Sequence, residues 1–218
     1  MVRVMAEERN NQIIRKDAKN CFVESLNDSF SIGKIHFNFA TYDLSKPSGK
    51  RQTNSVSIYI GAAEFLELNR KLFCGELKFL MQSRNKNDDA TPLFQSIGGT
   101  SAKNLKAMGK ERKDGKSLSR IMRLSAGKKS ELLLCAESGA GIEDEKGLIV
   151  PKFGSEPENR VVVGMTFESF SELVLLTKAH YDAWLSAAYI AEKRTKPQVK
   201  RNGFSETHEY PKDASEYF

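Results

Sequence analysis

Two neighbouring stretches of the sequence read as strands in which apolar and polar side chains alternate. Their polar side chains are the ones best suited to bind a ligand. In residues 29–42, apolar Ile35, Phe37 and Phe39 alternate with polar side chains, and residues 55–60 alternate in the same way. The faces expected to point away from the core carry basic, polar and aromatic groups, namely Lys34, His36, Asn38, Tyr42, Arg51, Ser57 and Tyr59. Proteins bind single-stranded nucleic acid with cations that contact phosphates and aromatic rings that stack on unpaired bases. The alternative is an ordinary solvated sheet face.

A second cationic group lies between residues 103 and 129. Glu111 and Asp114 are the only acids among its basic residues, which are Lys103, Lys106, Lys110, Arg112, Lys113, Lys116, Arg120, Arg123, Lys128 and Lys129. A mobile cationic loop favours polyanion binding, driven by counterion release, whereas a solvated linker is the alternative. We expect the phosphate contacts to come from Lys34, Arg51, Arg120, Arg123, Lys128 and Lys129.

Patterns that would indicate catalysis or a bound metal are weak. The stretch 109–117, GKERKDGKS, has five residues between its glycines where a phosphate-binding loop has four, and no hydrophobic strand precedes it. The histidines His36, His180 and His208 have no ligand-like spacing with cysteines or carboxylates. We therefore expect no catalytic residues, no metal ligands and no cofactor.

Overall composition narrows the class of protein. The chain has 218 residues and a net charge of +6, which favours polyanionic partners. No apolar run is as long as a membrane span, and the N-terminal residues lack the apolar core of a signal peptide. Cys21, Cys74 and Cys135 are far apart and odd in number, as is typical of reduced thiols. We expect a cytoplasmic protein that makes no membrane contact.

One strand-to-helix unit occurs twice in the sequence. Residues 51–73 read as a strand that turns directly into a helix, and residues 160–179 repeat this order. Aligned without gaps, both units share a Phe-x-Glu-Leu pattern at the start of the helix. Internal repetition predicts a fold made of two similar halves, although any two amphipathic strand–helix units look partly alike.

The pattern along the chain predicts an α+β fold, with antiparallel sheets that are each followed by a helix. We expect a charged leader (1–19) and one domain (20–196) made of two similar halves (20–82 and 118–196). A basic flexible loop (83–117) joins the halves, and a disordered acidic tail (197–218) ends the chain. Residues 138–141, SGAG, are expected to form a turn. An OB-fold barrel with added helices is the alternative fold.

The C-terminal residues are net acidic and end in two aromatic side chains. Asp213, Glu216, Tyr217 and Phe218 resemble the tail of bacterial and phage single-stranded DNA-binding proteins. That resemblance implies a segment that recruits replication or recombination proteins and competes with DNA for a basic groove.

The order of strands and helices over residues 21–192 resembles the Whirly family and its transcriptional-coactivator relatives. This resemblance implies a duplicated four-stranded sheet plus helix, single-stranded DNA bound across the sheets, and assembly through the helices. It is architectural and assigns no individual residue.

These observations predict a non-catalytic single-stranded DNA-binding protein of phage or mobile-element origin that acts in replication or recombination, with RNA as a possible ligand. The broad apolar arc of the last helix, around Trp184, predicts a homo-oligomer. The alternative is a phage-encoded protein-interaction module, such as an inhibitor or adaptor of a host protein.

Overall fold

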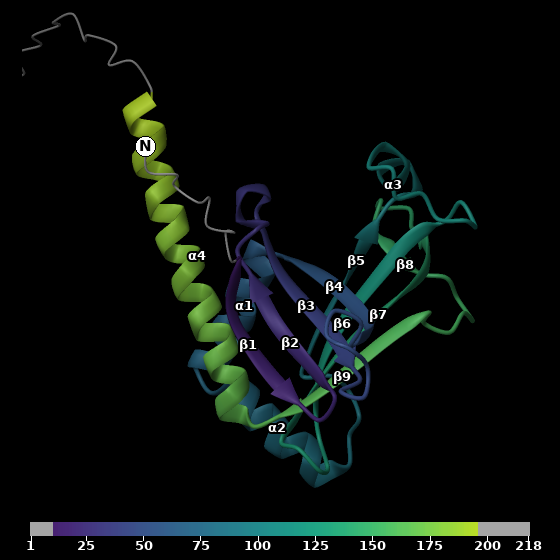
Figure 1. Ribbon diagram of the computed structural model, residues 1–218. Helices are drawn as coiled ribbons and strands as arrows, with labels where there is room; N and C mark the ends of the chain where they lie inside the picture. Colours follow the sequence, from purple (N-terminus) through teal and green to yellow (C-terminus); the bar gives the residue numbers. More distant parts are fainter. Residues whose placement is uncertain (1–10, 196–218) are drawn as a thin grey trace, which may run out of the picture. The chain divides into compact units, whose positions relative to one another are not determined.

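The computed structural model describes residues 11–195, which form two sheets and four helices of the α type (Figure 1). The chain divides into two compact units, one ending at Trp184 and one beginning at Leu185. The first unit contains both sheets, and the second contributes the C-terminal part of the last helix to the described residues. Within the described chain, no helix combines the length and the apolar character needed to cross a membrane.

The first sheet is an antiparallel meander of four strands in the order β1-β2-β3-β4. Its strands are β1 (Gln12–Ala18), β2 (Cys21–Leu26), β3 (Lys34–Tyr42) and β4 (Gln52–Gly61). A short 3-10 turn, η1 (Phe30–Ile32), precedes β3, and the helices α1 (Ala62–Phe73) and α2 (Glu76–Asn87) follow β4. Gly75, at φ 79°, permits the turn between the two helices.

The second sheet is also antiparallel and has five strands. They are β5 (Phe94–Thr100), β6 (Ser117–Ala126), β7 (Leu132–Glu143), β8 (Ile149–Pro151) and β9 (Asn159–Met165). The long strands run in the order β5-β6-β7-β9, while the short β8 pairs with the far end of β7. Helix α3 (Ala102–Ala107) connects β5 to β6, and α4 (Phe167–Thr195) follows β9.

In both sheets the last long strand leads into a helix, although the second sheet has α3 between β5 and β6 and β8 between β7 and β9. Val56, Ile58 and Ile60 of β4 are buried, and so are Val161, Val163 and Met165 of β9. Phe65 and Leu68 of α1 are buried like Phe170 and Leu173 of α4. The expected α+β fold with antiparallel sheets is confirmed. The strands form two sheets and not the single closed barrel of the alternative fold.

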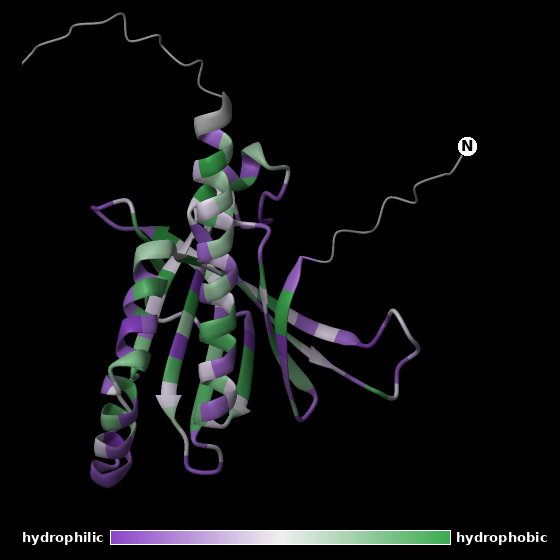
Figure 2. Cartoon of the chain, turned by 90° about the vertical axis from the view of Figure 1, so that its left-hand side faces the viewer, coloured by the Kyte–Doolittle hydropathy of each residue, from purple (hydrophilic) through white to green (hydrophobic). Residues whose placement is uncertain are grey.

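One face of the first sheet, here called the inner face, packs against the helices. Phe37 of β3 meets Phe65 of α1 with ring centroids 6.1 Å apart, and Thr177 of α4 donates a hydrogen bond to Ser25 of β2. Burial of each aromatic side chain contributes roughly 1.5–3 kcal/mol. In Figure 2 apolar segments recur along the strands and along α4. The outer face of this sheet, which carries Tyr59, is therefore left for other contacts.

Three regions differ from the sequence-based expectations. The expected leader includes β1, which pairs with β2. The expected flexible loop contains the end of α2, the strand β5 and the helix α3. The expected turn at residues 138–141 lies within β7.

Glycines explain the last two differences. They permit close packing between strands, but in the sequence they also indicate loops and turns. A Cβ on Gly99 of β5 would lie 2.2 Å from the Leu118 carbonyl oxygen, and one on Gly141 of β7 would lie 2.9 Å from the Ser119 nitrogen. Both glycines are strand residues at positions where two backbones approach closely. The sequence alone does not distinguish such a glycine from one in a turn.

Candidate nucleic-acid interface

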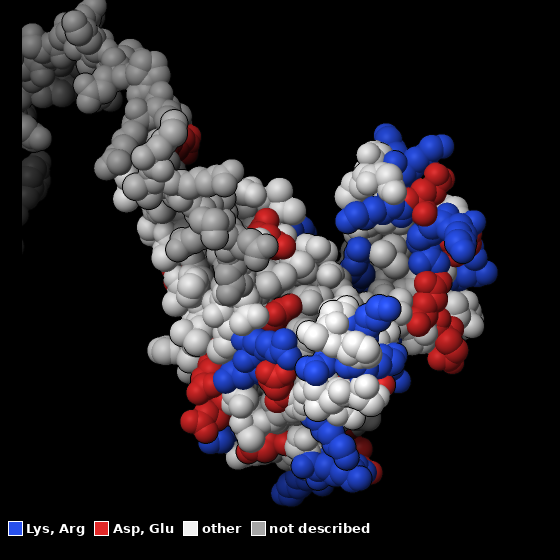
Figure 3. Space-filling view, viewed as in Figure 1, with Lys and Arg blue, Asp and Glu red and all other residues white. Residues whose placement is uncertain are grey.

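A cleft of about 570 Å³ separates the C-terminal end of β4 and the start of α1 from β5, α3 and the turn before β8. We call it the inter-sheet cleft. In Figure 3 a hollow divides the surface at this place, with basic side chains on its α3 side. Its volume lies within the range of roughly 300–1,000 Å³ that is usual for sites that bind small ligands. The cleft can therefore hold a group of the size of a nucleotide.

Arg120 of β6 lies on the wall of this cleft without a carboxylate partner among the described residues. Its Nη1 donates a hydrogen bond of 2.7 Å to the Thr100 hydroxyl, and its guanidinium carbon lies 5.7 Å from the centre of the Tyr59 ring. The side chain is half-buried, and burial lowers its pKa from the ordinary value. Burying a cation without a counter-charge is costly, so the site favours the arrival of an anion.

Most of the other described arginines have the acidic partner that Arg120 lacks. Arg15, Arg70, Arg84, Arg112, Arg123 and Arg160 each form an ion pair with an acidic side chain. Arg51 has none, but it is exposed and donates to the Lys46 carbonyl oxygen. Arg120 therefore combines partial burial with the lack of an acidic partner in the described part of the chain.

Tyr59 presents an aromatic ring to the cleft, and 41% of the residue is exposed. The ring stacks on His36 of the neighbouring strand, with centroids 4.3 Å apart and planes 22° apart. His36 is itself held by Asp28, whose Oδ1 lies 2.9 Å from His36 Nδ1. The histidine, expected to be exposed, is only 6% exposed because Tyr59 covers it. It supports the tyrosine ring and does not form part of the open surface.

Apolar and small residues form the rest of the cleft. Ile32, Met108 and Leu148 lie at its mouth and are exposed, although each has a large apolar side chain. Gly98 of β5 pairs with Arg120, and a Cβ at Gly98 would meet nothing within 4 Å. The cleft thus joins an apolar opening to a cationic wall, with free space beside the guanidinium.

Two further charged side chains line the cleft. Lys34, at the start of β3, is exposed, and Glu64 lies in the first turn of α1. Glu64 accepts a hydrogen bond from the Ser96 hydroxyl, 3.0 Å from its Oε2. Burial raises the pKa of Glu64, while the Ser96 hydroxyl and the charge of Lys34 act in the opposite direction.

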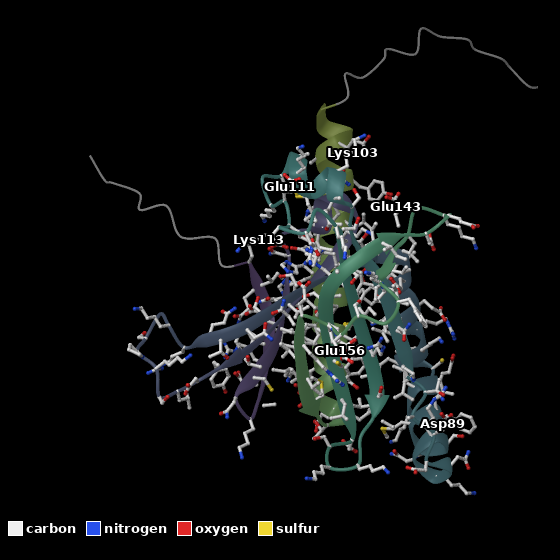
Figure 4. All side chains as sticks on the ribbon, turned by 90° about the vertical axis from the view of Figure 1, so that its right-hand side faces the viewer. Asp89, Lys103, Glu111, Lys113, Glu143 and Glu156 are labelled. Atoms are coloured by element: carbon white, nitrogen blue, oxygen red, sulfur yellow. The ribbon has the colours of Figure 1, made fainter. Side chains whose placement is uncertain are left out.

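The lysines of α3 and of the segment after it surround one end of the second sheet. Figure 4 places Lys103 and Lys113 there, together with Glu111, and places Asp89 at the opposite end beside the end of α2. Lys110 lines the cleft directly. Arg112 instead binds Glu158 and Asp114, which fixes the segment after α3 to the loop before β9.

The structure brings together some of the residues that the sequence singled out. Lys34, His36, Tyr59 and Arg120 gather at the inter-sheet cleft or directly behind it. Asn38 and Tyr42 share the outer face of the first sheet with Tyr59, as expected from the alternation. Asn38 donates to Glu24, however, and the Tyr42 hydroxyl donates to the Ala18 carbonyl oxygen.

Other predicted residues lie away from the cleft. Tyr42 pairs with Gln52, about 20 Å along the strand from Tyr59, and Arg51 is next to this end. Arg123 is three residues from Arg120, so it points to the opposite face of β6, where it binds Glu137. Lys128 and Lys129 lie in the turn after β6, and Lys128 pairs with Asp88 at the end of α2.

Several residues that line the cleft were not predicted from the sequence. Glu64 looks like an ordinary acid at a helix start, and Ile32 and Met108 look like core residues. The pair Gly98-Gly99 was the one available signal, because adjacent glycines in a strand often mark close approach of another group.

The expected partner-binding residues Asp213, Glu216, Tyr217 and Phe218 lie outside the described residues, and so does His208. Within residues 11–192, no group of three or more histidine, cysteine or acidic side chains could hold a metal ion. No protein-family model, curated protein or solved structure matches the chain. The resemblance to the Whirly family stays a prediction.

Proposed function

We propose that this chain binds single-stranded nucleic acid in the inter-sheet cleft and does not catalyse a reaction on it. The observation that carries the proposal is the half-buried guanidinium of Arg120, which has no acidic partner among the described residues and lies over the partly exposed ring of Tyr59, 5.7 Å from its centre. A phosphate and an adjoining unpaired base satisfy both groups at once.

Each part of the ligand has a counterpart in the cleft. A phosphate accepts hydrogen bonds from Arg120, and Lys34 and Lys110 add positive charge along the same path. A base stacks on Tyr59, whose other side rests on His36. The apolar mouth at Ile32, Met108 and Leu148 covers the edge of a stacked base. Duplex DNA keeps its bases stacked on one another, so the tyrosine favours a single strand.

A titration of fluorescently labelled oligo-dT, followed by anisotropy, tests the proposal. We expect binding that prefers the single strand over a duplex competitor and weakens steeply between low and moderate salt. The variant Arg120→Gln is expected to bind more weakly. The matched control is Arg51→Gln, because Arg51 also lacks an ion pair in the described chain but lies outside the cleft.

The outcomes separate the proposal from general electrostatic attraction. Equal losses for the two arginine variants would show that net charge, and not the cleft, attracts the oligonucleotide. No binding by the unaltered protein at low salt would overturn the proposal. RNA in place of DNA, tested with oligo-U, identifies the preferred sugar without changing the site.

A protein-interaction module is the second candidate function. It is favoured by Phe73 and Phe79, which are exposed on consecutive helices α1 and α2 near the exposed Cys74. Binding through such an apolar surface depends little on ionic strength, whereas phosphate binding does not survive high salt. The salt titration therefore discriminates between the two functions.

A further inference from the structure

Glu64 is an acidic side chain in a cleft that otherwise favours anions. It lines the inter-sheet cleft with Arg120, Lys34 and Lys110. Phosphates are repelled by a carboxylate, so Glu64 does not help to bind the backbone of a nucleic acid. If the cleft accepts a single strand, Glu64 must face a part of the ligand other than its phosphates.

Its place at a helix start explains only part of this arrangement. Glu64 is the third residue after Gly61, the N-cap of α1, where acids are favoured by the helix dipole. A fully solvated acid would meet that need equally well. Glu64 is instead half-buried, and the Ser96 hydroxyl of the other sheet donates to its Oε2. This contact fixes the carboxylate at the wall of the cleft.

A carboxylate held in this way accepts hydrogen bonds and donates none. Its two oxygens offer about four acceptor positions, of which the Ser96 hydroxyl occupies one and the backbone N–H of Gly61 another, so that about two stay open to a ligand. Among the bases, guanine alone presents two adjacent N–H donors on its Watson–Crick edge, at N1 and N2. Adenine and cytosine each pair their amino group with a ring-nitrogen acceptor there, and thymine flanks its N–H with two carbonyl oxygens. An ionised carboxylate therefore favours guanine.

We infer that Glu64, fixed by Ser96, recognises a guanine base that stacks on Tyr59 while Arg120 holds a neighbouring phosphate. All four residues line the same cleft. The cleft has a volume of about 570 Å³, so the ring of a purine has room. The inference rests on the proposed function and specifies the base that the cleft prefers.

A competition experiment tests the inference with strands that differ at one base. The probes are dT decamers in which one central position is T, G, A, C or inosine, each competing with a labelled dT decamer. The guanine strand is expected to bind roughly 5- to 100-fold more tightly than the others, because a bidentate contact discriminates bases by about this factor. Inosine lacks the 2-amino group and is expected to lose most of this advantage.

The variant Glu64→Gln assigns the preference to the carboxylate. Its amide keeps the size of the side chain but replaces one acceptor oxygen with a donor, so the guanine preference is expected to disappear. Binding of plain dT is expected to stay the same or to tighten, because the variant removes a negative charge. The control Glu67→Gln alters an exposed acid on the same helix, paired with Arg70, and is expected to retain the preference. Circular dichroism verifies that both variants are folded.

Each contrary result has a distinct meaning. Equal affinity of the unaltered protein for all five strands would overturn the guanine inference while leaving the cleft as a binding site. A guanine preference that survives Glu64→Gln would also overturn it, because another group would then read the base. No binding of any strand at low salt would overturn the proposed function and the inference together.

Discussion

The Tyr59 ring stacks on His36, with centroids 4.3 Å apart and planes inclined by 22°, so that one face of the tyrosine is occupied. The two residues pair across β3 and β4. Arg120 of the second sheet approaches the same ring, with its guanidinium carbon 5.7 Å from the centre. One tyrosine therefore connects both sheets at the cleft, and its exposed part is the stacking surface that the proposed function requires.

Replacing Tyr59 tests this surface. Tyr59→Ala is expected to weaken oligo-dT binding about 5- to 150-fold, because stacking on an aromatic side chain contributes roughly 1–3 kcal/mol per base. Tyr59→Phe keeps the ring and is expected to bind nearly as well as the unaltered protein. Phe79→Ala serves as the control, because Phe79 is an exposed aromatic residue on α2 that does not line the cleft. Anisotropy titrations measure all three. Unchanged binding by Tyr59→Ala would exclude the ring as a contact.

His36 is expected to act through Tyr59 and not through the ligand. His36→Ala removes a buried ring and is expected to lower the free energy of unfolding by roughly 2–5 kcal/mol and to weaken binding, because Tyr59 loses its support. His36→Phe keeps a stacking partner and is expected to restore most of the binding. Urea unfolding and anisotropy together test this. A phenylalanine variant that is folded but binds as weakly as the alanine variant would show that the imidazole itself contacts the ligand.

Alternation and amphipathic spacing predicted much of the fold. The inner-face residues Phe37 and Phe39 and the helix residues Phe65 and Leu68 are buried as their spacing indicated. β5 was missed because its pairing with β6 depends on backbone groups and on Gly98-Gly99, which carry no hydrophobic signal. The hydrophobic pattern of a sequence predicts which side chains are buried. It does not predict a strand that is held chiefly by main-chain hydrogen bonds.

The site was harder to predict because it depends on contacts between distant parts of the chain. Alternation placed His36 and Tyr59 on one face correctly, but it could not show that one covers the other. Arg120 and Arg123 looked equivalent in a basic cluster, yet three residues along a strand put them on opposite faces. The two arginines differ in their partners, because Arg123 forms an ion pair with Glu137 whereas Arg120 lines the cleft.

The two glycines of β5 provide a steric test of the cleft. Gly98→Val adds a side chain that meets nothing within 4 Å at a position of ordinary strand geometry, so the variant is expected to fold. Its side chain enters the cleft beside Arg120 and is expected to weaken oligonucleotide binding tenfold or more. Gly99→Val is expected to unfold the sheet, because its Cβ would lie 2.2 Å from the Leu118 carbonyl oxygen. Thermal melting separates the two effects. Full binding by a folded Gly98→Val variant would place the ligand elsewhere.

The burial of Glu64 also predicts how stability depends on pH. Because burial raises the pKa of Glu64, the folded protein holds this proton more tightly than the unfolded chain, and ionisation of Glu64 costs stability as the pH rises. Glu64→Gln is therefore expected to raise the melting temperature at pH 7. This gain is expected to shrink below the raised pKa and to vanish below the ordinary glutamate value of about 4.3.

Glu67 provides the opposite sign on the same helix. Its hydrogen bonds to Arg70 lower its pKa, so its contribution to stability is present above the ordinary value and is lost as the pH falls through the lowered one. Glu67→Gln is expected to lower the melting temperature at pH 7, with the difference fading in acid. Melting curves between pH 3 and about pH 8 test both variants. A fall in melting temperature at pH 7 for Glu64→Gln would show that its role at the start of α1 outweighs its burial, and that the carboxylate is held in the cleft by the needs of the helix.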